Sequence, residues 1–217
     1  AVSGDRAAQG VGIGPRAILI SGRMAREKNL DFAFGIYADV ARLTDAELVF
    51  IGSGPYRAAI EQQVRKQKLD GRVHFLGTLR GEPLVEAINT CDLLLITSTS
   101  ETQSMTTLQA MACELPVVVV AAGGLPEYVH DGENGFVISL EKKGMFVEKI
   151  VTLLNDAELA QRLGVAGRTS VAPFAPQHIA GRRRGQPGQH AQQARFAAAI
   201  RAGKNQRVAS RKGELDL

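Results

Sequence analysis

The segment LLLITSTSETQSMTTLQAMACELPVVVV (93–120) carries the pattern that decides the fold. Two runs of leucine, isoleucine and valine, LLLIT (93–97) and PVVVV (116–120), flank the helical pattern TTLQAMA. Neither run alternates polar with apolar residues, which is typical of strands buried on both faces of a parallel sheet. The connection exceeds the roughly dozen residues that a parallel crossover needs. The segment therefore predicts a strand, a crossover helix and a second, parallel strand.

The same alternation of apolar runs with helical patterns extends from Ala17 to Ile138. The other apolar runs are AILIS (17–21), ELVFI (47–51), RVHFL (72–76) and GFVI (135–138), and the helical patterns are NLDFAFGIYADVARL, YRAAIEQQVRKQK, EPLVEAINT and the short LPEYV. We predict an α/β fold with an open, doubly wound, mostly parallel, Rossmann-like sheet of about six strands. The following MFVEKIVTLLNDAELAQRLGVAGR predicts two amphipathic helices, separated near Asn155 and Asp156, either of which could cap the second.

Composition places the chain among globular proteins. It has 217 residues, of which 45% are hydrophobic and 22% charged, enough for one large domain or two small ones. The net charge of +4 favours anionic ligands without being a nucleic-acid signature. Cys91 and Cys113 lie in apolar surroundings without CxxC spacing, which indicates buried thiols in a reducing compartment. No apolar run approaches the ~20 residues of a membrane span, so we expect a cytoplasmic protein, with the inner face of the membrane as an alternative.

The two ends of the chain differ from the middle. Residues 1–15 are glycine-rich and unpatterned, which predicts a linker before a domain over 16–170. Residues 171–217 are basic and contain few large apolar side chains, which predicts a largely disordered tail with a weak helix over 189–202.

The unusual loop sequences all follow predicted strands. They are SGRMAREKN (21–29), GSGP (52–55), GTLRGE (77–82), TSTSETQSM (97–105) and AAGGLPE (121–127). The carboxyl ends of parallel strands share one edge of the sheet, where open α/β folds bind ligands. Glycines permit close backbone approach, helix N-termini offer N–H groups to anions, and arginine and lysine add charge. Together they predict a pocket for a phosphorylated ligand, with a nucleotide as the leading candidate.

Each feature alone has a structural explanation. Arg23 and Lys28 could be solvated surface charges, and Gly52 and Gly54 could form a turn. The negative charge of Glu101 would stabilise the N-terminus of the helix that follows, whether or not the residue binds a ligand. Because all five loops are predicted at the same edge of the sheet, a shared ligand-binding site explains them better than separate structural roles do.

Other site classes do not fit the residues. VGIGPR and GSGPYR lack the third glycine of GxGxxG, and no acidic residue follows ELVFIGSG, as a dinucleotide site would require. A P-loop, a GxSxG elbow and metal-ligand spacings of histidine and cysteine are absent from the sequence.

Taken in order, these loops resemble the C-terminal donor-binding domain of a GT-B fold, retaining family-4 ("group 1") glycosyltransferase. The resemblance covers roughly residues 16–170 and rests on SGRMAREKN, ELVFIGSGP, RVHFLGTL, CDLLLITSTSETQSMTTLQAMACELPVVVV and GGLPEYVHDGENGFVI. It implies transfer of a hexose from a UDP- or GDP-sugar to a hydroxyl acceptor, with no cofactor and no divalent metal.

The resemblance also implies roles for individual residues. Arg23 and Lys28 would grip the donor diphosphate and neutralise its charge as the glycosidic bond breaks. Glu101, the first carboxylate of the family's E-x7-E element, would hold hydroxyls of the transferred sugar. The implied donor-binding positions around these catalytic residues are Gly22, Gly52, Gly54, Pro55, Thr78, Leu79, Thr102, Gln103, Ser104, Met105, Thr106 and Gln109.

Three positions depart from the family pattern. Gln109 replaces the second glutamate of E-x7-E, so we expect weakened or altered binding of the ribose hydroxyls rather than its loss. Gln103 and Ser104 replace a frequent Phe-Gly pair. Glu114 stands where the family has a glycine, which predicts a different or mildly strained helix end.

The resemblance implies a partner domain that the sequence lacks. A GT-B enzyme holds its acceptor on an N-terminal domain, supplied in cis or by a separate subunit, and that domain could contact a membrane peripherally. The isolated chain should then bind donor weakly and turn over little. Three alternatives remain: a stand-alone nucleotide-sugar-binding module or partner subunit, a GT-B nucleotide-sugar epimerase, and a nucleic-acid binder using the basic tail. From Gly181 onward the tail carries one aromatic residue, Phe196, so we expect no specific nucleic-acid binding.

Overall fold

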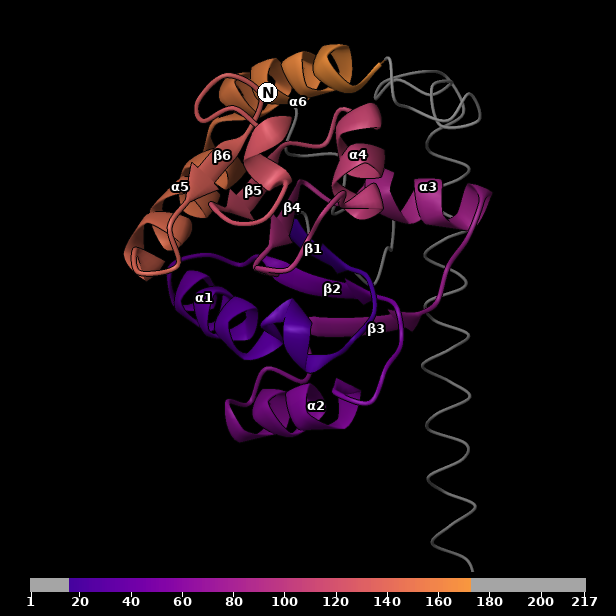
Figure 1. Cartoon of the computed structure of the whole chain (residues 1–217). Coiled ribbons are helices and arrows are strands. Elements are labelled where there is room, and N and C mark those ends of the chain that lie inside the picture. Colours follow the sequence, from indigo (N-terminus) through magenta and orange to yellow (C-terminus); the bar gives the residue numbers. More distant parts are fainter. Residues whose placement is uncertain (1–15, 173–217) are drawn as a thin grey trace, which may run out of the picture.

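The computed structural model describes residues 16–172, which form a six-stranded sheet flanked by helices (Figure 1). The strand order is β3-β2-β1-β4-β5-β6, and all neighbouring strands are parallel. The strands are β1 (Ala17–Ser21), β2 (Glu47–Ile51), β3 (Val73–Gly77), β4 (Leu93–Ile96), β5 (Val117–Val120) and β6 (Phe136–Ile138). The prediction of a doubly wound parallel sheet of about six strands is confirmed.

Helices cover both faces of the sheet. They are α1 (Leu30–Leu43), α2 (Arg57–Lys66), α3 (Glu82–Thr90), α4 (Met105–Ala112), α5 (Lys143–Asn155) and α6 (Ala157–Val171). Figure 1 shows α3 and α4 on the side of the sheet opposite to α1 and α2. The chain winds one way from β1 to β3 and the other way from β4 to β6, so right-handed crossovers fall on opposite faces. Helix α5 packs against α1, and α6 packs against α4.

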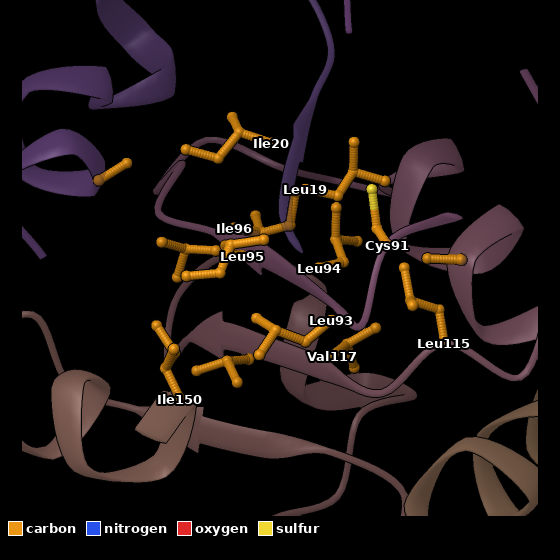
Figure 2. Close-up of a cluster of buried hydrophobic side chains, with 14 of the residues drawn as sticks. Leu19, Ile20, Cys91, Leu93, Leu94, Leu95, Ile96, Leu115, Val117 and Ile150 are labelled. Atoms are coloured by element: carbon orange, nitrogen blue, oxygen red, sulfur yellow. The ribbon is translucent and has the colours of Figure 1, made fainter. Parts of the chain in front are cut away.

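The strands are buried on both faces, which explains why their sequences do not alternate. All four residues of β4 and all four of β5 are buried. Figure 2 shows Leu19 of β1 beside Leu94 of β4, with Ile150 of α5 approaching the sheet. Cys91 and Cys113 are both buried, as the sequence predicts. The two helix layers thus bury the central strands β4 and β5 along their whole length.

Two predicted helix ends are found, and one predicted helix is shorter than expected. The carboxylate of Asp156 accepts the N–H of Leu159 at 2.9 Å and caps α6. Glu114, just after α4, has a φ of 59°, the left-handed conformation that its glycine-like position requires. The pattern LPEYV forms only the 3-10 turn η3 (Leu125–Glu127). The chain after it is held by Asn134, whose side chain donates to the Tyr128 carbonyl at 3.0 Å and accepts the N–H of His130 at 2.7 Å.

The predicted linker 1–15 and the predicted tail 171–217, apart from Val171 and Ala172, lie outside the described residues. Among the described residues, no helix is both long enough and apolar enough to cross a membrane.

Helix α6 holds the C-terminal end of α4 through a glycine contact. A Cβ on Gly164 would lie 2.1 Å from the carbonyl oxygen of Glu114, so only glycine permits this approach. Arg168, one turn further on, donates to the carboxylate of Glu114 at 3.2 Å. Because α4 begins at the strand-end loops, this contact helps to set where its N-terminus lies.

We expect Gly164→Ala to lower the free energy of unfolding by about 1–3 kcal/mol, because the new methyl group overlaps a backbone carbonyl. Gly144→Ala in α5 is the matched control, since its Cβ would meet no atom within 4 Å. That control should be neutral or stabilising by up to about 1 kcal/mol through helix propensity. Urea unfolding followed by circular dichroism measures both, and equal effects would contradict the packing argument.

Candidate functional site

A small, partly open pocket lies at the carboxyl ends of β1 and β4. These strands are neighbours in the sheet, and the strand order reverses between them, which is where open α/β sheets bind ligands. The apolar wall of the pocket includes Ile20, Phe50 and Ile96. The lining also includes Ser21, Gly22, Arg23, Lys28, Thr97, Ser98 and Glu101.

The loops after β1 and β2 pack backbone against backbone beside this pocket. The N–H of Met24 donates to the carbonyl of Ser53 at 2.9 Å. A Cβ on Gly52 would lie 1.9 Å from the carbonyl oxygen of Gly22, and one on Gly54 would lie 2.2 Å from that of Met24. Gly52 and Gly54 therefore have a packing role, which positions the loop that carries Arg23.

Hydroxyl groups at the end of β4 hold the turn that carries Lys28. The hydroxyl of Thr97 donates to the carbonyls of Lys28 at 3.1 Å and Asn29 at 3.2 Å. The hydroxyl of Ser98 donates to the carbonyl of Glu27 at 3.2 Å. The sequence analysis assigned no role of their own to Thr97 and Ser98, although polar residues directly after a buried strand were a usable signal.

Lys28 and Glu101 form an ion pair across the pocket. The Lys28 Nζ lies 2.6 Å from the Glu101 Oε1, and the two side chains are 28% and 13% exposed. The pair joins the 3-10 turn η2 (Arg26–Lys28) to the loop after β4. Two residues predicted for different parts of one ligand thus contact each other directly.

The glycine pair after β5 clamps the backbone of Glu101. The N–H of Gly124 donates to the Glu101 carbonyl at 2.7 Å. A Cβ on Gly123 would lie 2.2 Å from that carbonyl oxygen, and one on Gly124 would lie 2.1 Å from that of Thr102. The fifth loop therefore fixes the main chain of Glu101, while Lys28 fixes its side chain.

Arg23 lines the same pocket but is exposed. Within the part of the chain that the structure describes, its guanidinium has no hydrogen-bond or ion-pair partner. Arg23 is thus the uncompensated cation of the pocket, whereas the charge of Lys28 is offset by Glu101.

The N-terminus of α4 has four N–H groups without partners inside the helix. The protein satisfies two: Ser104 donates to the Tyr128 hydroxyl at 3.1 Å, and Thr107 donates to the Ser104 hydroxyl at 3.4 Å. The N–H groups of Met105 and Thr106 have no partner among the described residues. Among the implied donor-binding positions at this helix start, Met105 and Thr106 therefore keep N–H groups that can bind an anion, whereas the N–H of Ser104 is already bonded.

Tyr128 was missed at the sequence level. Burial raises the pKa of its hydroxyl above the ordinary tyrosine value, although hydrogen bonds with Ser104 and Thr107 act in the opposite direction. An aromatic residue directly after GGLPE was the available signal.

The predicted residues separate into a group that lines the pocket and a group that surrounds it. Gly22, Arg23, Lys28 and Glu101 share the pocket lining. Thr78 contacts the second loop, since its hydroxyl lies 3.0 Å from that of Ser53. The remaining positions lie outside the lining: Gly52, Gly54, Pro55, Leu79, Thr102, Gln103, Ser104, Met105, Thr106 and Gln109. Across residues 16–172, no group of three or more histidine, cysteine or acidic side chains could hold a metal ion.

Comparison with known proteins agrees with this geometry. The model of the "Glycosyl transferases group 1" family matches residues 5–170. The sulfoquinovosyl transferase SQD2 of Arabidopsis thaliana is 33% identical over 156 residues, which cover 70% of this chain and 29% of that protein. The chain thus spans less than a third of that relative's length.

Two solved structures share the fold. Anabaena Alr3699/HepE, in complex with UDP and glucose, has a TM-score of 0.66 at 24% identity, covering 72% of this chain and 43% of that one. The C-terminal domain of LpcC, a group 1 family protein from Francisella tularensis, has a TM-score of 0.64 at 24% identity, covering 75% of this chain and 87% of that one. With the family model matching most of its length, this chain belongs to the group 1 glycosyl transferases.

Proposed function

We propose that this domain binds the nucleotide-sugar donor of a retaining glycosyltransferase that transfers a hexose from a UDP- or GDP-sugar to a hydroxyl acceptor. The observation that carries the proposal is the convergence of Arg23, Lys28 and Glu101 in one pocket between β1 and β4. The similar fold of HepE, whose structure contains UDP and glucose, supports a nucleotide-sugar ligand.

In this proposal the two cations bind the diphosphate. Arg23 and Lys28 both line the pocket, and the N–H groups of Met105 and Thr106 begin the neighbouring helix α4. Breaking the glycosidic bond leaves its electron pair on a phosphate oxygen, and fixed positive charges beside that oxygen lower the barrier. These charges supply the stabilisation that a divalent metal gives in other enzymes, so the proposal requires no metal.

Glu101 is proposed to accept hydrogen bonds from hydroxyls of the transferred sugar. Its carboxylate is largely buried and its backbone is clamped by the fifth loop, so its direction is preorganised. The nucleobase would lie along the loops after β2 and β3, near Gly52 to Pro55, Thr78 and Leu79. The contact between Ser53 and Thr78 joins those two loops into one surface.

The chain is proposed to be the donor half of a two-domain enzyme. It spans 29% of the length of SQD2 and 87% of a solved domain that is the C-terminal one of its protein. The acceptor would be held by an N-terminal domain, either in cis or as a separate subunit. The isolated chain should then bind donor and transfer little or no sugar.

We expect Arg23→Ala to weaken nucleotide binding by about 10- to 100-fold, the worth of a charged hydrogen bond to phosphate. Titration calorimetry of the chain with UDP, GDP and ADP measures this and identifies the base. Arg162→Ala is the matched control, because it removes the same charge from an exposed position on α6. Equal affinities of the two variants, or negligible binding of all three nucleotides to the unaltered chain, would contradict the proposal.

Gln109→Glu should strengthen binding of the preferred nucleoside diphosphate several-fold, because a carboxylate accepts ribose hydroxyls more strongly than an amide does. Gln109 is half-buried on α4, the helix whose first N–H groups are proposed to face the diphosphate. The 2′,3′-dideoxy form of the nucleotide is the control and should bind both proteins equally. A gain of the same size for the dideoxy form would exclude ribose contact.

A further inference from the structure

We propose that Glu101 makes the site discriminate against the nucleoside diphosphate product, by capturing Lys28 whenever no sugar occupies the pocket. The inference rests on the proposed function, and it concerns which of two nucleotides the site retains. Its basis is the ion pair between Lys28 Nζ and Glu101 Oε1, which lie 2.6 Å apart.

The burial of Glu101 makes this pair costly to break without a substitute. The Glu101 side chain is 13% exposed, and Lys28 is its one ion-pair partner among the described residues. A largely desolvated carboxylate that loses its cation is strongly destabilised unless another donor replaces it. Lys28 can therefore turn fully towards phosphate only when something else donates to Glu101.

The pair is also built to re-form. The Glu101 carbonyl is held by the N–H of Gly124 at 2.7 Å. The Lys28 carbonyl is held by the hydroxyl of Thr97 at 3.1 Å. With both main chains fixed, only the flexible lysine stem needs to move between carboxylate and phosphate.

A nucleotide sugar supplies the missing donors and the nucleoside diphosphate does not. Hydroxyls of the hexose can donate to Glu101, which releases the Lys28 ammonium to the diphosphate. During transfer the glycosidic C–O bond breaks with its electron pair on the phosphate oxygen. The acceptor oxygen bonds to the sugar carbon and gives its proton to that phosphate or to water. Once the sugar has left, Glu101 recaptures Lys28, and Arg23 alone remains as an uncompensated cation for the product.

The test compares Glu101→Gln with the unaltered chain by titration calorimetry, using UDP with UDP-glucose and GDP with GDP-mannose. An amide holds a lysine ammonium less strongly than a carboxylate does, so the variant should bind the nucleoside diphosphate about fivefold more tightly. It should bind the nucleotide sugar about fivefold less tightly, because sugar hydroxyls lose a charged acceptor. Glu133→Gln, at an exposed position outside the pocket, removes the same charge and should change neither affinity.

The double variant Lys28→Met with Glu101→Gln isolates the ion pair. In the Lys28→Met background, Glu101→Gln should no longer strengthen binding of the nucleoside diphosphate, because no ammonium is left to release. A gain of the same size there, or a single variant whose two affinities shift in the same direction, overturns the inference while leaving the proposed donor site intact. Absence of nucleotide binding to the unaltered chain overturns both.

Discussion

Burial of both faces of a six-stranded parallel sheet is the constraint on which the site depends. With helices over each face, the central strands β4 and β5 are fully buried, and the polar groups of the site lie where the strands end. All strands are parallel, so the five loops that follow β1 to β5 emerge at one edge. Charged and hydroxyl side chains of distant sequence segments are thereby concentrated in one small region.

Close backbone contacts turn these loops into a rigid site. The loop after β1 lies against Gly52 and Gly54 of the loop after β2, and Glu101 lies against Gly123 and Gly124. Each contact leaves no room for a Cβ, so a side chain at any of these glycines would push apart the loops that carry Arg23 and Glu101. The glycine-rich character of the loops therefore serves protein packing directly and ligand approach only in addition.

The electrostatic character of the pocket depends on which charged side chains pair with each other, as well as on how many charges line it. Lys28 and Glu101 neutralise each other at 2.6 Å, and their partial burial strengthens the attraction. A site that looks doubly positive along the chain thus presents one uncompensated cation, Arg23. In the proposed mechanism, sugar hydroxyls replace Lys28 at Glu101, and Lys28 then binds the phosphate. Recognition of the sugar is thereby linked to recognition of the phosphate.

Local pattern by itself determined the sheet type, the edge that carries the site and the chemical character of the residues there, since periodicity, glycine and helix capping act over a few residues. The Asp156 cap and the strained Glu114 were predictable for the same reason. Tertiary structure alone decided that β1 lies beside β4, because strand order depends on crossovers that no local pattern encodes. That adjacency brings Lys28 to Glu101 across a separation of 73 residues, and the pairing of β4 with β5 brings Tyr128 to the start of α4. Such contacts form only when the whole sheet has assembled, so the sequence could name the participants but not pair them.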